Sequence, residues 1–233
     1  AAIRNRPEDY GQVPDGGPLV DRVLGDQTAF DTSKEMTPGD FTLRQALRTS
    51  AFWLISFGHA FPAMVFVTLT IHTVPMVIDR GFSLGQAALV VVTFTTVAGM
   101  FQFLGGIIGD RVPKRLGIAV FISIQSLGVA IAALAQNMPM LLVFAVIFGV
   151  GGGGRVPLLI AIRGEYFGRN SFATIFGFSS IPISFVLIGG PVVVGYLVDQ
   201  LGSYTVSLWG LAGIGVIGAV LIGFARRPRL TGS

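Results

Sequence analysis

The sequence predicts an all-α membrane protein in which six transmembrane helices form one bundle. Hydrophobic residues make up 52% of the 233 residues and charged residues only 12%, which is about half the charged fraction of a soluble domain. Long apolar segments divide the chain into six candidate spans, each as long as the roughly 20 residues that a helix needs to cross a bilayer. These spans are 52–78, 83–109, 116–135, 139–162, 171–198 and 204–225.

Positive charges are distributed unequally between the two sets of segments that connect the spans. Fourteen of the sixteen Lys and Arg residues fall in one set, Arg80 falls alone in the other, and Arg155 lies inside a span. Because cytoplasmic loops carry the excess of Lys and Arg, the set of fourteen is predicted to be cytoplasmic. An even number of spans then places both termini of this chain on that side. The basic excess forms no clustered patch, so the sequence does not indicate nucleic-acid binding.

Local signals divide the chain into four segments. Residues 1–41 are rich in charge, Pro and Gly without apolar periodicity, which predicts a disordered cytoplasmic linker. Thr42 and Gln45 form a capping-box pattern, so residues 42–50 are expected to form a short helix on the inner membrane surface. Residues 51–226 are the six-helix transmembrane domain, and 227–233 are a cytoplasmic tail. Without an initiator Met, the chain is expected to be a piece of a longer protein or a processed one.

The sequence gives no indication of an enzyme or of a cofactor. Cysteine is absent, which excludes thiolate metal sites and a Cys nucleophile, and the two His residues make a His-based metal site unexpected. The segment 149–154 formally matches G-x-G-x-x-G, but it lies inside an apolar span instead of between a strand and a soluble helix. No paired acids or Ser–His arrangement accompanies the spans, so no catalytic group is assigned.

A run of glycines interrupts the fourth span. Gly151, Gly152, Gly153 and Gly154 are followed closely by Pro157, and this composition predicts a bendable stretch. Interrupted helices of this kind often mark the binding sites of transporters. The alternative is close helix packing, since small residues let helix backbones approach each other in a membrane.

The strongest local pattern is the decapeptide 106–115, which joins the second span to the third. It places Asp110 at the water boundary with three cations nearby in sequence, Arg111, Lys114 and Arg115. Such an acid–base cluster can hold helix ends together in one conformation and release them in another. We therefore expect these four residues to act in gating. A charged turn that obeys the positive-inside rule is the alternative.

This decapeptide resembles the loop motif of the major facilitator superfamily, G-x-x-x-D-R-x-G/P-R/K-R/K. Segments 163–170 and 189–204 resemble the loop after the tenth helix and the eleventh helix of that family. Residues 6–16 resemble the start of the central loop in bacterial members related to monocarboxylate and oxalate/formate transporters. The resemblance covers essentially the whole chain.

The resemblance implies a twelve-helix secondary transporter that works by rocker-switch alternating access, with the six spans here as helices seven to twelve. The N-terminal six-helix half is then a missing partner, residues 1–41 belong to the central loop, and the expected location is a bacterial inner membrane. The expected substrates are small organic anions such as monocarboxylates, coupled to protons or to a counter-substrate. Two alternatives stay open: drug or metabolite efflux, and a six-helix membrane subunit without transport activity.

The resemblance also implies that the first and fourth spans line the substrate cavity. The first span carries His59, and the fourth carries Arg155. An Arg inside a span costs about 2.5–3.5 kcal/mol on insertion scales, so it usually faces a cavity or a partner. Both residues lie roughly 10 Å from the inner end of their spans at the rise of a helix. We therefore expect Arg155 to bind the carboxylate of a substrate, with His59 as a titratable neighbour. The alternatives are an Arg155 that reaches headgroups or backbone carbonyls and a His59 that only packs.

Overall fold

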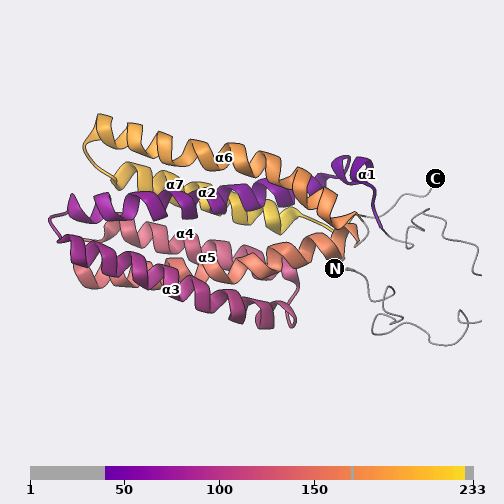
Figure 1. Cartoon of the computed structure of the whole chain (residues 1–233), viewed down its shortest axis with the longest axis horizontal. Helices are drawn as coiled ribbons and strands as arrows, with labels where there is room; N and C mark the ends of the chain where they lie inside the picture. Colours follow the sequence, from indigo (N-terminus) through magenta and orange to yellow (C-terminus); the bar gives the residue numbers. More distant parts are fainter. Residues whose placement is uncertain (1–39, 169–170, 229–233) are drawn as a thin grey trace, which may run out of the picture. The chain divides into compact units, whose positions relative to one another are not determined.

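The computed structural model describes residues 40–168 and 171–228, and within them it contains seven α-helices and no strand (Figure 1). A short helix α1 (Leu43–Leu47) precedes six long ones: α2 (Ser50–Ile78), α3 (Leu84–Gly109), α4 (Lys114–Leu134), α5 (Met138–Phe167), α6 (Phe172–Leu201) and α7 (Thr205–Phe224). All six long helices are apolar enough to cross a membrane, which confirms the predicted fold class. Most of the predicted linker and of the predicted tail lie outside the described residues.

Side-chain caps fix where several helices begin. The Thr42 hydroxyl accepts from the Gln45 amide N–H at 3.3 Å, and the Thr42 N–H donates to the Gln45 side chain at 2.8 Å, which is the predicted capping box at the start of α1. Ser83 and Gln86 repeat this arrangement before α3. These bonds satisfy amide groups that the first turn of a helix leaves without an intrahelical partner.

The fifth helix is longer than hydropathy predicts. The apolar segment ends at Ile162, but α5 continues to Phe167 and ends at Gly168, whose φ of 84° favours glycine. Arg163 was therefore placed wrongly in a cytoplasmic loop, because it lies within α5 and is 2% exposed. When Arg163 is counted inside the bundle, thirteen Lys and Arg residues remain on the predicted cytoplasmic side and one lies on the opposite side. The orientation inferred from charge therefore does not change.

Helix α5 has the most buried apolar segment of the six long helices. It packs along α3 and α4, while α4 also packs on α7, and α2 packs on α6 and α7. Figure 1 shows α3 and α6 at opposite sides of this arrangement, and these two helices have the least buried apolar segments. Aromatic residues fill the interior, with Phe144 and Phe148 of α5 fully buried in one of the two core clusters.

The glycine run of α5 makes these close contacts possible. A Cβ on Gly151 would overlap the backbone of α4 at Phe121 and Gln125, and a Cβ on Gly153 would overlap the carbonyl oxygen of Ala98 in α3. The helix is continuous through the run and through Pro157, so the structure shows close packing and no break here. That these glycines and Pro157 act as a hinge during transport stays a prediction.

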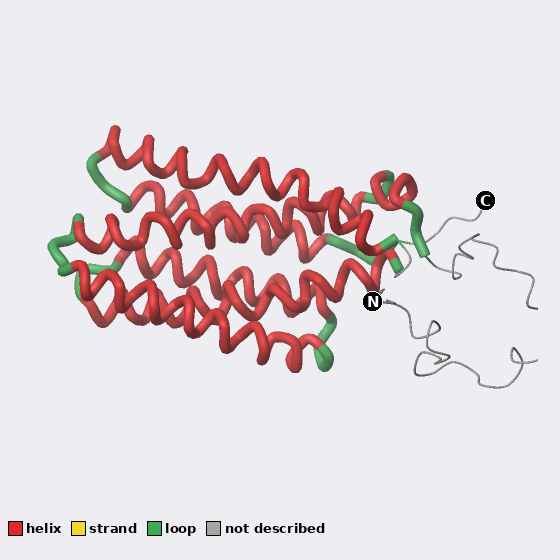
Figure 2. The backbone as a smooth tube through the Cα atoms, in the orientation of Figure 1, coloured by secondary structure: helices red, strands yellow, loops and turns green. Residues whose placement is uncertain are grey.

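The two ends of the bundle differ in charge. Figure 2 shows α1 and the α3–α4 connection at one end and the α2–α3, α4–α5 and α6–α7 connections at the other. The described cations outside the bundle interior gather at the α1 end: Arg44, Arg48, Arg111, Lys114, Arg115, Arg226 and Arg227. At the opposite end, Arg80 donates to the carbonyl of Ala132 near the end of α4 at 2.9 Å, where a cation is favourable. Partial burial lowers the pKa of Arg80 from its ordinary value.

Candidate functional site

Arg155 lies inside the bundle between α2, α4 and α5. It is 4% exposed. Its Nε donates to the side-chain oxygen of Gln125 at 2.9 Å, and its Nη2 donates to the carbonyl of Pro62 at 3.2 Å. The Gln125 side-chain amide also donates to the Pro62 carbonyl, at 2.9 Å. The Nη1 atom is buried and has no hydrogen-bond partner in the described part of the chain, so the guanidinium retains unused donors.

Arg163 lies eight residues further along α5, about 12 Å at the rise of a helix. Its Nη1 donates to the Leu159 carbonyl at 2.7 Å, and its Nε and Nη2 donate to the Ser179 hydroxyl of α6 at 3.2 and 3.1 Å. The guanidinium also lies over the ring of Phe176, 5.3 Å from the ring centre, in the geometry of a cation–π contact.

His59 of α2 is the third neighbour of Arg163. Its Nδ1 lies 3.2 Å from Arg163 Nη2. A guanidinium cannot accept a hydrogen bond, so Nδ1 must be the acceptor and the neutral ring carries its proton on Nε2. His59 is half-buried, and its Nε2 makes no hydrogen bond to any described residue.

The structure places His59 beside Arg163, and the expectation that Arg155 and His59 together bind a substrate stays a prediction. Both arginines face α2, but His59 bonds Arg163, and Arg155 bonds the backbone three residues further along at Pro62. Depth along the helix placed the two groups at a similar level, but it could not tell which arginine faces the histidine. The alternative in which Arg155 bonds a backbone carbonyl is seen, although the carbonyl belongs to Pro62 and not to the glycine run.

Neither arginine has an acidic partner among the residues that the structure describes. No carboxylate lies within 4.0 Å of either guanidinium in the described chain. The helices α2 to α7 contain only two acids, Glu165 and Asp199, both near a helix end. Burial of an ion costs several kcal/mol even after relaxation. The interior of α5 thus holds two positive charges that no described side chain neutralises.

The predicted gating cluster has a different arrangement from the one expected. Asp110 ends α3 and is exposed, but none of Arg111, Lys114 and Arg115 forms an ion pair with it in the described residues. Lys114 instead pairs with Glu165 of α5, with Nζ and Oε2 3.2 Å apart. The described residues therefore contain no ion pair within the predicted cluster, and the ion pair that is present joins α4 to α5. The gating role of these four residues stays a prediction.

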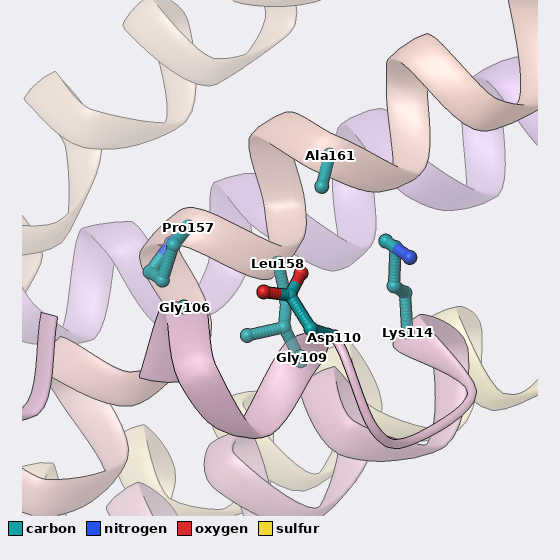
Figure 3. Close-up of a pocket in the computed structure, with 7 residues that line it drawn as sticks. All are labelled: Gly106, Gly109, Asp110, Lys114, Pro157, Leu158 and Ala161. Carbon is teal, nitrogen blue, oxygen red and sulfur yellow. The ribbon is translucent and has the colours of Figure 1, made fainter. Parts of the chain in front are cut away.

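A cavity lies beside Asp110, between the α3–α4 connection and α5. Figure 3 shows Asp110 and Lys114 at the two ends of this connection, with Pro157 and Ala161 of α5 facing them. The cavity has a volume of about 240 Å³. The Asp110 carboxylate therefore borders an open space, where a group from outside the described chain can approach it.

Sequence reasoning missed Arg163, Gln125 and Ser179. Helical periodicity offered one signal, because residues eight apart lie about 80° from each other around a helix and Arg163 shares a broad face with Arg155. Gln125 and Ser179 gave no signal, since a polar residue within an apolar span has no recognisable partner until the helices are placed.

Comparison with known proteins identifies the family. The sequence pattern of the Major Facilitator Superfamily matches residues 43–233. Monocarboxylate transporter 12 of Rattus norvegicus is 25% identical over 189 residues, which cover 77% of this chain and 38% of the rat protein. The hexuronate transporter of Bacillus subtilis (strain 168) is 30% identical over 145 residues, or 61% of this chain and 34% of the relative.

A third relative is the niacin transporter NiaP of Acinetobacter baylyi, 29% identical over 115 residues, which cover 49% of this chain and 26% of the relative. The chain thus spans less than two fifths of the length of these relatives. The family comprises transporters and not enzymes, in agreement with the absence of a catalytic arrangement from the sequence. On the match to most of its length and on its six membrane helices, the chain belongs to the Major Facilitator Superfamily.

Proposed function

We propose that this chain is the C-terminal six-helix half of a secondary transporter for small organic anions such as monocarboxylates. One observation carries the proposal: Arg155 and Arg163 are buried on α5, and no carboxylate of the described residues pairs with either of them. Transport proceeds by rocker-switch alternating access against an N-terminal half. Both termini of the chain lie in the cytoplasm, and the protein resides in a bacterial inner membrane.

The anion supplies the missing negative charge. A guanidinium is planar and presents its N–H groups in a fork that matches a carboxylate. The unused Nη1 of Arg155 provides such donors at the level of the glycine run. In a medium of low dielectric constant, the attraction between these charges is much stronger than in water. Binding of an organic anion is therefore favoured over binding of a neutral molecule of similar size.

The named relatives support the same substrate class. Monocarboxylates, hexuronate and niacin, named in three of the relatives, are all organic acids. A second candidate function, drug efflux, has support as well, because a multidrug transporter of Bacillus subtilis is 26% identical over 130 residues. The two uncompensated positive charges disfavour cationic drugs and so favour the anion assignment.

The gate is assigned to the α1 end of the bundle. Asp110 borders a cavity there, and Arg111, Lys114 and Arg115 surround the same connection. In the proposed transporter, Asp110 holds the inner end of the missing half in one conformation and releases it in the other. This proposal differs from an internal cluster because the partner of Asp110 lies outside this chain.

Substitution of Arg155 in the intact transporter tests the function. Arg155→Gln is expected to abolish uptake of labelled carboxylates into proteoliposomes, while Arg155→Lys keeps the charge, loses the fork and raises KM. Arg44→Gln, which removes an exposed cation of α1, is the control and should transport normally. Fluorescence-detected size exclusion verifies that each variant is folded.

The outcomes separate the candidate functions. Normal carboxylate uptake by folded Arg155→Gln would remove Arg155 from the site. Efflux of neutral or cationic compounds by the wild type, with no carboxylate uptake, would favour the second candidate. A protein that moves no solute with both halves present would indicate a membrane subunit without transport activity.

A further inference from the structure

We propose that His59 and Arg163 form a proton-gated anion site, in which protonation of His59 releases Arg163 to bind a carboxylate. The proposal rests on the proposed function and adds a residue pair that sequence reasoning did not bring together. It starts from two facts: His59 Nδ1 and Arg163 Nη2 are 3.2 Å apart, and the described chain supplies no acid to either group.

The hydrogen bond allows only one protonation state of the ring. Arg163 can only donate, so His59 Nδ1 must offer a lone pair. A proton that binds Nδ1 occupies that lone pair, and the N–H···N bond to Nη2 is lost. A protonated His59 and a His59–Arg163 hydrogen bond therefore exclude each other. The pair is a two-state element controlled by a single proton.

Release of Arg163 leaves a usable binding group. Three of its contacts involve Leu159 and Ser179 and are independent of His59, so they continue to hold the guanidinium in place. The Nη2–H that pointed at the ring becomes free for an incoming carboxylate oxygen, and the protonated ring adds a second donor beside it. Charge-assisted bonds of this kind are short and strong.

Charge balance links the proton to the anion. The empty pair carries one positive charge, from Arg163. A proton alone would place two positive charges side by side in the bundle interior, which is costly at low dielectric constant. A proton together with one carboxylate restores a single net positive charge. The loaded and empty states then have equal net charge, so both can cross between the two conformations at similar electrostatic cost.

No other described ionisable group competes at this place. Arg155 is the remaining charged group on the inward faces of α5, while α6 contributes the neutral Ser179 and Phe176. Helix α7 contains no ionisable residue, and α4 contributes the neutral Gln125. The acids Glu165 and Asp199 and the cations Lys114 and Arg115 lie near helix ends. Proton binding at this level of the bundle is therefore assigned to His59.

Two substitutions of His59 have opposite expected effects. The measurement is KM for a labelled monocarboxylate between pH 5 and 8, in proteoliposomes that contain the intact transporter. In the wild type, KM rises with pH by on the order of tenfold per unit once His59 has lost its proton. His59→Gln offers a permanent acceptor to Arg163, so KM is high at every pH. His59→Ala offers none, so KM is low at every pH.

Substitutions of Arg163, the partner of His59, and of Ser179, a neighbour of Arg163, complete the test. Arg163→Gln removes the binding group, which raises KM about 10- to 100-fold and abolishes its pH dependence. Ser179→Ala removes two contacts of Arg163 but keeps the His59 contact, so it retains the wild-type pH dependence. A purely structural pair would lower the yield of folded protein in these variants and leave the pH dependence of KM unchanged.

The outcomes distinguish this inference from the proposed function. If the wild type takes up no carboxylate, the proposed function fails and this inference fails with it. If the wild type takes up a carboxylate with a KM that is independent of pH, or if both His59 variants keep the wild-type pH dependence, only this inference is overturned.

Discussion

A methyl group added to Gly153 tests whether the glycine run packs helices together or bends. In Gly153→Ala, the new Cβ would overlap the carbonyl oxygen of Ala98 and lie 2.7 Å from the carbonyl carbon. These atoms belong to the backbone of α3, so no side chain can rotate away and the two helices must separate. Gly164→Ala is the matched control on the same helix, because its Cβ would meet only the Phe172 ring, at 3.9 Å.

The expected sizes follow from two opposing terms. Replacement of a helical Gly by Ala stabilises a helix by up to about 1 kcal/mol, and both variants gain this. Overpacking of a tight contact costs about 1–3 kcal/mol, and only Gly153→Ala incurs it. The control should therefore be about 1–3 kcal/mol more stable than Gly153→Ala. At about 2–4 °C per kcal/mol for a domain of this size, the melting temperatures should differ by roughly 2–12 °C.

Thermal unfolding of the intact transporter in detergent, followed by size exclusion after heating, measures the difference. Carboxylate uptake by the same two variants is measured alongside. Equal melting temperatures for Gly153→Ala and Gly164→Ala would refute the packing argument. Equal melting temperatures combined with slower turnover in Gly153→Ala would support the hinge interpretation instead.

Two further predictions concern orientation and gating. Since native Cys is absent, a Cys at Gln200 should react with an impermeant thiol reagent outside intact cells and a Cys at Lys114 should not; the reverse pattern would contradict the orientation. Asp110→Asn should leave KM near normal but lower kcat about tenfold, the effect of a transition-state interaction worth about 1.4 kcal/mol, in the range of one hydrogen bond. Asp199→Asn, at the other end of the bundle, is its control, and an unchanged kcat in Asp110→Asn would reduce Asp110 to part of a charged turn.

The positions of the helices could be predicted from the sequence because local features of the chain determine them. A sufficiently long apolar segment forms a membrane helix, and the Thr42 hydroxyl and the Gln45 amide cap α1 independently of the rest of the chain. The end of α5 was less predictable. Hydropathy falls at Arg163, but the backbone continues to Phe167, since the buried guanidinium finds its partners on α2 and α6 and not in water.

The pairing inside the site could not be predicted because it depends on which helix covers which face of α5. Arg155 and His59 were expected to face one cavity because their spans line it and they lie at a similar depth, but depth says nothing about rotation around the helix axis. Once the structure gives the neighbours, Gln125 and Ser179 explain the result: one holds Arg155 towards α4, and the other holds Arg163 towards α6.

The positions of the glycines and of the arginines on α5 both follow from the way the neighbouring helices surround α5. At about 100° per residue, Gly151 and Gly153 lie roughly 160° apart, and they meet α4 and α3 respectively. Gly152 lies between those two directions, and its Cβ would meet the Phe66 ring of α2 at 2.7 Å.

Arg155 lies about 40° from the direction of Gly151, and Arg163 about 20° from that of Gly152. The first arginine therefore reaches the border of α4 and α2, and the second reaches α2 directly. Since the glycines bring α3 and α4 too close to leave room for a long side chain, the sector that faces α2 and α6 is where α5 can carry its charges. A substitution that separates α5 from α3 should thus disturb anion binding as well as stability, because it rotates or shifts the helix on which both guanidinium groups are fixed.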